Sequence, residues 1–170
     1  MKKIGVIGLG DMGSGIALNL IKNGFKVFGS DLLPARQEAF KEMGGSLETS
    51  ISDIGKKCDA VFVMVMNGSQ AKSIIFDEDG LAKNMEKGST VILSATIKPS
   101  EAEEIGQLIK DTGIKFIDTP VSGGFPGAQS GTLTLMASAS EDVMSKTETF
   151  YRLFLQTFIM LELRQVKVKR

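Results

Sequence analysis

The chain has 170 residues, of which 42% are apolar and 24% are charged, and its 20 basic side chains balance 20 acidic ones. These values are typical of a soluble globular protein of about one domain. The absence of His excludes Ser-His and Cys-His catalysis and argues against a metal site, and the single Cys58 excludes an intramolecular disulfide. No apolar run is long enough for a membrane span or a signal peptide, so we expect a cytoplasmic protein without a membrane partner.

The N-terminal stretch predicts a strand, a glycine-rich turn and a helix in direct succession. A short apolar run over 3–8 enters Gly8-Leu9-Gly10-Asp11-Met12-Gly13, and an amphipathic pattern over 13–23 follows. In a dinucleotide-binding turn the first glycine allows the sharp turn, the second allows close approach of a diphosphate, and the third allows the helix to pack on the strand. The diphosphate is expected at the N-terminus of the helix, where free N–H groups favour negative charge.

Asp31 is the expected carboxylate of the same motif. It closes the next apolar run, 26–30, at about the spacing of 20 residues at which an acidic side chain accepts the ribose hydroxyls of NAD. The alternative is an ordinary strand–helix turn followed by an exposed Asp. A 2′-phosphate would be repelled by this carboxylate, so we expect NAD to bind in preference to NADP.

Short apolar runs alternate with helical patterns along most of the chain. We predict strands at 3–8, 26–30, 60–66, 90–94, 114–118 and 132–137, and helices at 13–23, 34–43, 50–57, 69–75, 99–112 and 139–154. This alternation predicts an α/β fold of the Rossmann type, with a doubly wound, mostly parallel sheet. Cys58 is interpreted as a small buried residue at the start of a strand.

Polar residues at the ends of the predicted strands are candidate ligand contacts, because ligands of such sheets lie beyond the carboxyl ends of the strands. Met66 ends one apolar strand, and Ser94 and Thr96 follow another. The two hydroxyls could contact a ribose or a nicotinamide amide, or they could cap the helix that begins near Pro99. The sequence leaves both readings open.

A second glycine-rich stretch lies at 118–128. There Ser122 is followed by Gly123 and Gly124, which together form a cluster of hydrogen-bond donors suited to a carboxylate. The alternative is a plain connection to the strand predicted at 132–137.

Two stretches, GVIGLGDMGSGIALNL and DTPVSGGFPGAQSGTLTLMAS, resemble the signature sequences of the β-hydroxyacid dehydrogenase family. The resemblance covers residues 1 to about 153, and ILSATI and MASASE are most similar to its L-threonate branch. It implies a Rossmann domain followed by a helical domain, a small hydroxy acid as substrate, and an oligomer for the full-length form. It also implies residue roles: Gly8, Leu9, Gly10, Met12, Gly13, Asp31, Met66 and Thr96 contact the cofactor, and Ser122, Gly123 and Gly124 bind the substrate carboxylate.

The general acid/base of this family is a lysine in a GxGxxxK motif on the interdomain helix, and these 170 residues contain no such motif. We therefore expect the catalytic lysine and the helical domain to be missing, and catalysis to be incomplete. Lys98, Lys72 and Lys83 are not expected to replace that lysine.

Residues 1–155 are expected to form the dinucleotide-binding domain, and residues 156–170 an aberrant tail. The last ten residues carry a net charge of +3, but without interleaved aromatic side chains they do not indicate nucleic-acid binding. Synonymous codons for 156–170 can be read in another frame as the family-like N-I-Y-H-V-G, so we expect a frameshift and a poorly packed segment. The alternative to an oxidoreductase is a stand-alone NAD-binding or partner-docking module.

Overall fold

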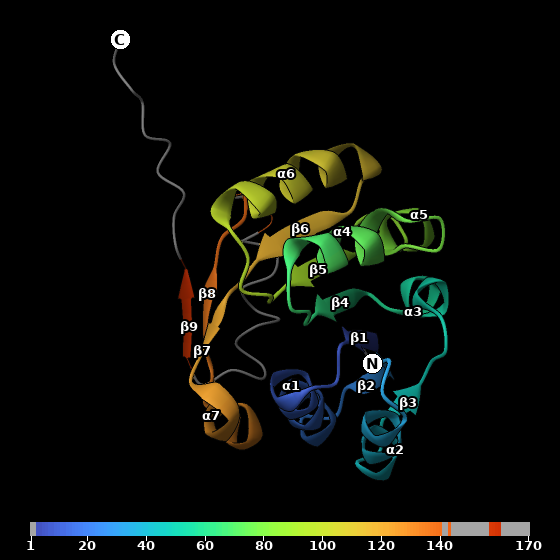
Figure 1. Cartoon of the computed structure of the whole chain (residues 1–170), viewed down its shortest axis with the longest axis vertical. Coiled ribbons are helices and arrows are strands. Elements are labelled where there is room, and N and C mark those ends of the chain that lie inside the picture. Colours follow the sequence, from blue (N-terminus) through green and yellow to red (C-terminus); the bar gives the residue numbers. More distant parts are fainter. Residues whose placement is uncertain (1–2, 141–142, 144–156, 161–170) are drawn as a thin grey trace.

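The computed structural model describes residues 3–140, residue 143 and, for the backbone only, residues 157–160. Its centre is a parallel six-stranded sheet in the order β3-β2-β1-β4-β5-β6 (Figure 1). The strands are β1 (Lys3–Ile7), β2 (Lys26–Ser30), β3 (Ser46–Leu47), β4 (Ala60–Val63), β5 (Thr90–Leu93) and β6 (Lys115–Asp118). This order is that of a dinucleotide-binding Rossmann sheet, so the predicted fold class is confirmed.

Helices cover both faces of this sheet, as Figure 1 shows. They are α1 (Asp11–Lys22), α2 (Pro34–Glu42), α3 (Ile51–Lys57), α4 (Gly68–Phe76), α5 (Leu81–Asn84) and α6 (Pro99–Ile109), the last continued by a 3-10 turn, η1 (Lys110–Thr112). One hydrophobic cluster packs α1 and α2 against one face of the sheet. A second cluster packs the helices α3, α4, α5 and α6 against the opposite face. No helix among the described residues has the length and apolar content needed to cross a membrane.

Burial on both faces explains why the strands read as continuous apolar runs. Alternate residues of β4 illustrate the division: Phe62 lies in the cluster under α1, whereas Val61 and Val63 lie in the cluster under α4. All three side chains are fully buried, and each contributes about 1.5–3 kcal/mol relative to an exposed position.

A smaller sheet follows the main one. It contains β7 (Val121–Ser122), β8 (Thr134–Ala137) and β9 (Thr157–Met160), with β7 antiparallel and β9 parallel to β8. The short helix α7 (Gly124–Ser130) connects β7 to β8. The backbone of β9 pairs with β8, and the expectation of a poorly packed segment over 156–170 stays a prediction, because its side chains lie outside the described residues. The helix predicted at 139–154 falls, apart from a few positions, outside the described residues, and residues 161–170 are outside them too.

Cys58 is buried as predicted, but it follows the last residue of α3 and lies two residues before β4 begins. It is 4% exposed at the end of α3. Burial raises the pKa of its thiol to about 12, with smaller contributions from nearby carboxylates. The thiol is therefore protonated at neutral pH and is inert as a nucleophile.

Helix α7 is held against α1 by an unusually close contact. A Cβ at Gly15 would lie 2.6 Å from the backbone and Cβ of Ala128, so only glycine allows the two helices to approach this closely. Asn19 strengthens the contact, because its side-chain amide donates to the carbonyl oxygens of Gly15 and Ala128, both at 2.8 Å. The second glycine-rich stretch is thus attached to the helix that begins at the first one.

Replacing Asn19 with Ala should loosen this attachment. The Asn19→Ala chain loses two part-buried hydrogen bonds, and we expect its free energy of unfolding to fall by about 1–3 kcal/mol. Asn23→Ala is the matched control on the same helix, because Asn23 donates one exposed hydrogen bond and its loss should cost about 0.5 kcal/mol or less. Urea denaturation of the three chains measures the difference. Equal stability of the two variants would show that Asn19 does not hold α7.

Candidate functional site

The turn between β1 and α1 has the backbone geometry that its three glycines predict. Gly8 adopts a φ of 91°, and a Cβ there would lie 2.0 Å from the Met64 carbonyl oxygen. A Cβ at Gly13 would lie 1.8 Å from the Gly8 carbonyl oxygen. Both glycines are required by the protein's own packing. Helix α1 consequently starts at Asp11, two residues before the predicted position.

Gly10 differs from the other two glycines. Its φ of −67° and ψ of −165° are open to any residue. The nearest atoms to a Cβ there would be those of the Arg36 guanidinium, at 3.5–3.6 Å, which is ordinary contact distance. No contact among the described residues therefore demands glycine at this position. The missing side chain instead leaves space beside the N-terminus of α1, where a dinucleotide diphosphate would fit.

The Asp31 carboxylate lies beside this turn, just beyond β2. Its Oδ2 accepts the backbone N–H of Leu9 at 2.7 Å, and its Oδ1 accepts that of Leu33 at 2.9 Å. Its side chain is only 6% exposed. The alternative of a freely exposed Asp is therefore wrong, because this carboxylate is fixed against the glycine turn. Its contact with a ribose stays a prediction.

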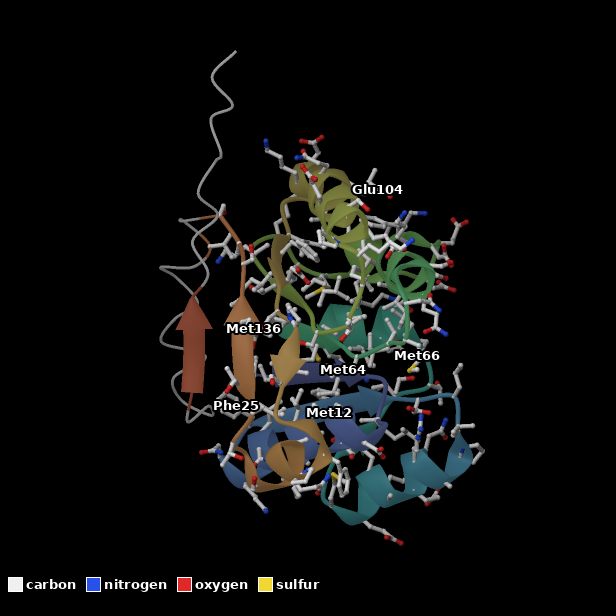
Figure 2. All side chains as sticks on the ribbon, turned by 60° about the vertical axis from the view of Figure 1, so that its left-hand side comes forward. Met12, Phe25, Met64, Met66, Glu104 and Met136 are labelled. Carbon is white, nitrogen blue, oxygen red and sulfur yellow. The ribbon has the colours of Figure 1, made fainter. Side chains whose placement is uncertain are left out.

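Leu9 and Met12 complete the predicted set within the turn. The Leu9 side chain is buried, at 3% exposure, so only its backbone could face a ligand. Met12 is half-buried at the start of α1. Met66 lies beyond β4, and Figure 2 shows its side chain at the surface, where it is 85% exposed.

The hydroxyls after β5 do not cap the next helix. Helix α6 begins at Pro99, and the backbone N–H of Lys98 is bound at 3.0 Å by the side chain of Glu101. Thr96 is exposed near this edge of the sheet. The capping alternative for Ser94 and Thr96 is therefore wrong, and the cofactor contact of Thr96 stays a prediction.

Two buried hydroxyls at this edge, one of them that of Ser94, lack hydrogen-bond partners within the described part of the chain. Ser94 Oγ and Thr119 Oγ1 are buried and have no hydrogen-bond partner among the described residues. They follow the paired ends of β5 and β6, where the Thr119 N–H donates to the Leu93 carbonyl at 2.8 Å. Thr119 was not predicted as a site residue, because an isolated Thr carries no pattern.

Ser122, Gly123 and Gly124 are all exposed at the junction of β7 and α7. Gly123 and Gly124 have φ values of 125° and 59°, a region that favours glycine. Asp118, at the end of β6, was also missed by sequence reasoning. It is half-buried, and burial raises the pKa of its carboxyl above the ordinary value.

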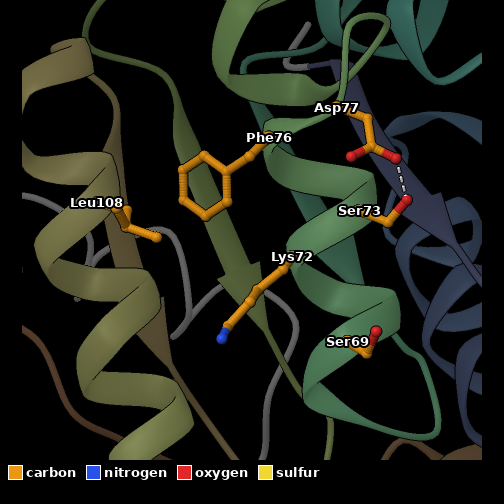
Figure 3. Close-up of a pocket in the computed structure, with 6 residues that line it drawn as sticks. All are labelled: Ser69, Lys72, Ser73, Phe76, Asp77 and Leu108. Carbon is orange, nitrogen blue, oxygen red and sulfur yellow. Dashed lines mark hydrogen bonds between the residues drawn. The ribbon is translucent and has the colours of Figure 1, made fainter.

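A separate surface depression lies between α4 and α6 (Figure 3). It is lined by Ser69, Lys72, Ser73, Phe76, Asp77 and Leu108, none of which was predicted as a site residue. Lys72 forms a 2.5 Å ion pair with Glu104 of α6, so its ammonium group is held by a carboxylate. The expectation that Lys72 is not a general base stays a prediction.

Comparison with known proteins gives one family for the chain. Residues 3–157 match the family model described as the NAD binding domain of 6-phosphogluconate dehydrogenase. An L-threonate dehydrogenase of Cupriavidus necator is 40% identical over 147 residues, covering 86% of this chain and 50% of that protein. A mitochondrial 3-hydroxyisobutyrate dehydrogenase of Mus musculus is 37% identical over 139 residues, covering 82% and 42%.

Solved structures similar to this chain include members of the same family. A 3-hydroxyisobutyrate dehydrogenase of Salmonella typhimurium superimposes with a TM-score of 0.86 at 30% identity, covering 94% of this chain and 56% of that one. One from Mycobacterium tuberculosis, solved with L-serine, gives 0.88 at 26% identity. The chain spans about half the length of the curated relatives it matches. It belongs to the β-hydroxyacid dehydrogenase family, of which it carries the NAD-binding domain.

Proposed function

We propose that the chain supplies the cofactor half of an NAD-dependent dehydrogenase that acts on a small hydroxy acid, of the L-threonate or 3-hydroxyisobutyrate kind. The observation that carries this proposal is Gly10, a glycine that no contact within the described residues requires, beside a fixed carboxylate. The names of the relatives support the substrate class. Bound NAD would supply the acceptor for hydride from the alcohol carbon of the substrate.

In this proposal each part of the site has one task. The Gly8–Gly13 turn holds the diphosphate, and Asp31 accepts the adenosine ribose hydroxyls. Met66 and Thr96 extend the contact toward the nicotinamide end. The hydroxyl of Ser122 and the amides of Gly123 and Gly124 bind the carboxylate of the hydroxy acid. The tight α1–α7 contact supports this division, because it ties the cofactor turn and the carboxylate-binding stretch to one packed pair of helices.

Substitution of the second and third glycines of the turn, Gly10 and Gly13, distinguishes an effect on cofactor affinity from an effect on the stability of the fold. Gly10→Ala fits the free chain, so its free energy of unfolding should stay within about 0.5 kcal/mol of wild type. The added methyl group would occupy the place of the diphosphate, and the affinity for NADH should fall by roughly tenfold or more. Gly13→Ala forces a methyl group against the Gly8 carbonyl and should destabilise the fold by about 1–3 kcal/mol or more.

Thermal unfolding and NADH titration by calorimetry measure both effects. Full NADH affinity in the folded Gly10→Ala chain would contradict the placement of the diphosphate. Absence of NADH binding by the wild-type chain would contradict the cofactor assignment itself.

The 170-residue chain should not oxidise hydroxy acids above background. A positioned general base contributes about 10²–10⁴-fold to such a reaction. Among the lysines of the described region, Lys72 is paired with Glu104, and Lys98 lies at the surface directly before helix α6. The measurement follows NADH formation from L-threonate and 3-hydroxyisobutyrate.

A longer chain that carries a GxGxxxK helix and a helical domain after residue 155 is the positive control, and should turn over one of these acids. Comparable activity of the 170-residue chain would contradict the prediction. Loss of that activity in Lys98→Ala would then identify Lys98 as the base.

A further inference from the structure

Two buried hydroxyl groups lie where the main sheet ends, and none of the roles above uses them. They belong to Ser94 and Thr119, which are 3% and 0% exposed. Neither Ser94 Oγ nor Thr119 Oγ1 has a hydrogen-bond partner among the described residues, so the two groups do not bond to each other either. A hydroxyl that leaves water without finding a partner destabilises a fold, and such groups are rare in native proteins.

The two residues are neighbours across the sheet. Strands β5 and β6 pair in parallel, with Leu93 opposite Asp118. Ser94 and Thr119 are the next residues along these two strands. The Thr119 N–H donates to the Leu93 carbonyl oxygen at 2.8 Å, which fixes the spacing of the two chains at this point.

Both hydroxyls lie on the face of the sheet that α1, α7 and β8 cover. Side chains alternate between the two faces along a strand, and Ile92 and Ile117, two positions earlier, belong to the hydrophobic cluster on this face. Leu93 and Ala95, the neighbours of Ser94, belong to the opposite cluster. The two hydroxyls are therefore on the same side, within an apolar layer that excludes bulk water.

The spacing of the strands suits one small bridging molecule. Neighbouring strands lie about 4.7–4.9 Å apart, whereas a direct bond between two hydroxyls is about 2.8 Å long. A single water oxygen that makes two such bonds spans a separation of this size. The burial of both residues leaves no access for a larger ligand.

We propose that Ser94 and Thr119 form the binding site of one internal water molecule, which joins the ends of β5 and β6. The water accepts a hydrogen bond from one hydroxyl and donates one to the other, as buried waters do for polar groups that the protein leaves unpaired. It ties together the two strand ends from which the chain leads to Thr96 and to Ser122. The bridge forms whether or not a cofactor is bound, so its test is independent of the proposed function.

Removal of either hydroxyl tests the bridge by thermal unfolding. Thr119→Val keeps the shape of the side chain, and Ser94→Ala removes the hydroxyl alone. In each variant the remaining hydroxyl loses its bridge, so the melting temperature should fall by about 2–6 °C. The double variant leaves no unpaired hydroxyl, so its loss should be smaller than the sum of the two single losses.

Thr134→Val is the matched control. Thr134 of β8 is half-buried and remains in contact with bulk water, so its melting temperature should stay within about 1 °C of wild type. A crystal structure at a resolution that shows ordered water gives the direct observation. One water within hydrogen-bond distance of both Ser94 Oγ and Thr119 Oγ1 is expected in wild type, and none there in the double variant.

Higher melting temperatures of both single variants would overturn the water site, because they would show that the two hydroxyls are buried dry. A direct bond between Ser94 Oγ and Thr119 Oγ1 in the crystal structure would overturn it too, as would a wild-type crystal structure without ordered water beside them. An equal loss in Thr134→Val would show that any exchange of threonine for valine has this effect, and it would likewise contradict the proposal.

Discussion

Helix α1 packs so closely on the end of β1 that the carbonyl oxygen of Gly8 occupies the place of a side chain at Gly13. The rest of the site depends on this approach. Because the helix begins directly over the strand, the turn between them is short, and the Leu9 N–H reaches the Asp31 carboxylate after the neighbouring strand β2. One backbone constraint thereby sets the distance between the proposed diphosphate position at the turn and Asp31, the proposed acceptor for a ribose.

The same helix, α1, also positions the second glycine-rich stretch. Gly15 and Asn19 lie further along α1, on the side that meets Ala128 of α7. Glycine at position 15 allows α1 and α7 to approach closely. The Asn19 amide then donates a hydrogen bond to the carbonyl oxygen of Ala128, 109 positions later in the sequence. The stretch that begins at Ser122 leads into α7, so its placement relative to the cofactor turn follows from packing on α1. The small sheet of β7 and β8 joins the main sheet through the bridge between Asp118 and Ser138.

Much of this architecture follows from the sequence because local patterns and buried packing agree. The apolar runs that became β1, β4 and β5 are buried on both faces, which leaves little freedom in their interpretation. Asp31 was singled out by its spacing from the glycine turn. The structure adds its hydrogen bond from the Leu9 N–H, and its contact with a ribose stays a prediction. Two helices begin with side-chain caps that the sequence analysis did not predict: Ser50 Oγ accepts the N–H of Asp53, and Asn67 Oδ1 accepts that of Gln70.

The features that sequence reasoning missed have no local signal. Strands β3 and β7 have two residues each, too few for any periodicity. Helix α7 contains two glycines and a proline, which oppose helix formation; it is stabilised by packing on α1. Pro126 is tolerated because it lies in the first turn, where no N–H is needed. Asn19 contacts Ala128 of the distant helix α7, and Arg36 contacts Asp31 at the end of the preceding strand. No pattern in the neighbouring sequence predicts either contact.

The central claim is that the β1–α1 turn and the Asp31 carboxylate together form one cofactor site. Hydrogen exchange measured by mass spectrometry, with and without saturating NADH, tests it directly. The account predicts slower exchange in peptides covering residues 9–14 and 31–33 together, with α5 unchanged. Unchanged exchange in both segments, or protection confined to the α4–α6 depression around 69–77, would contradict it.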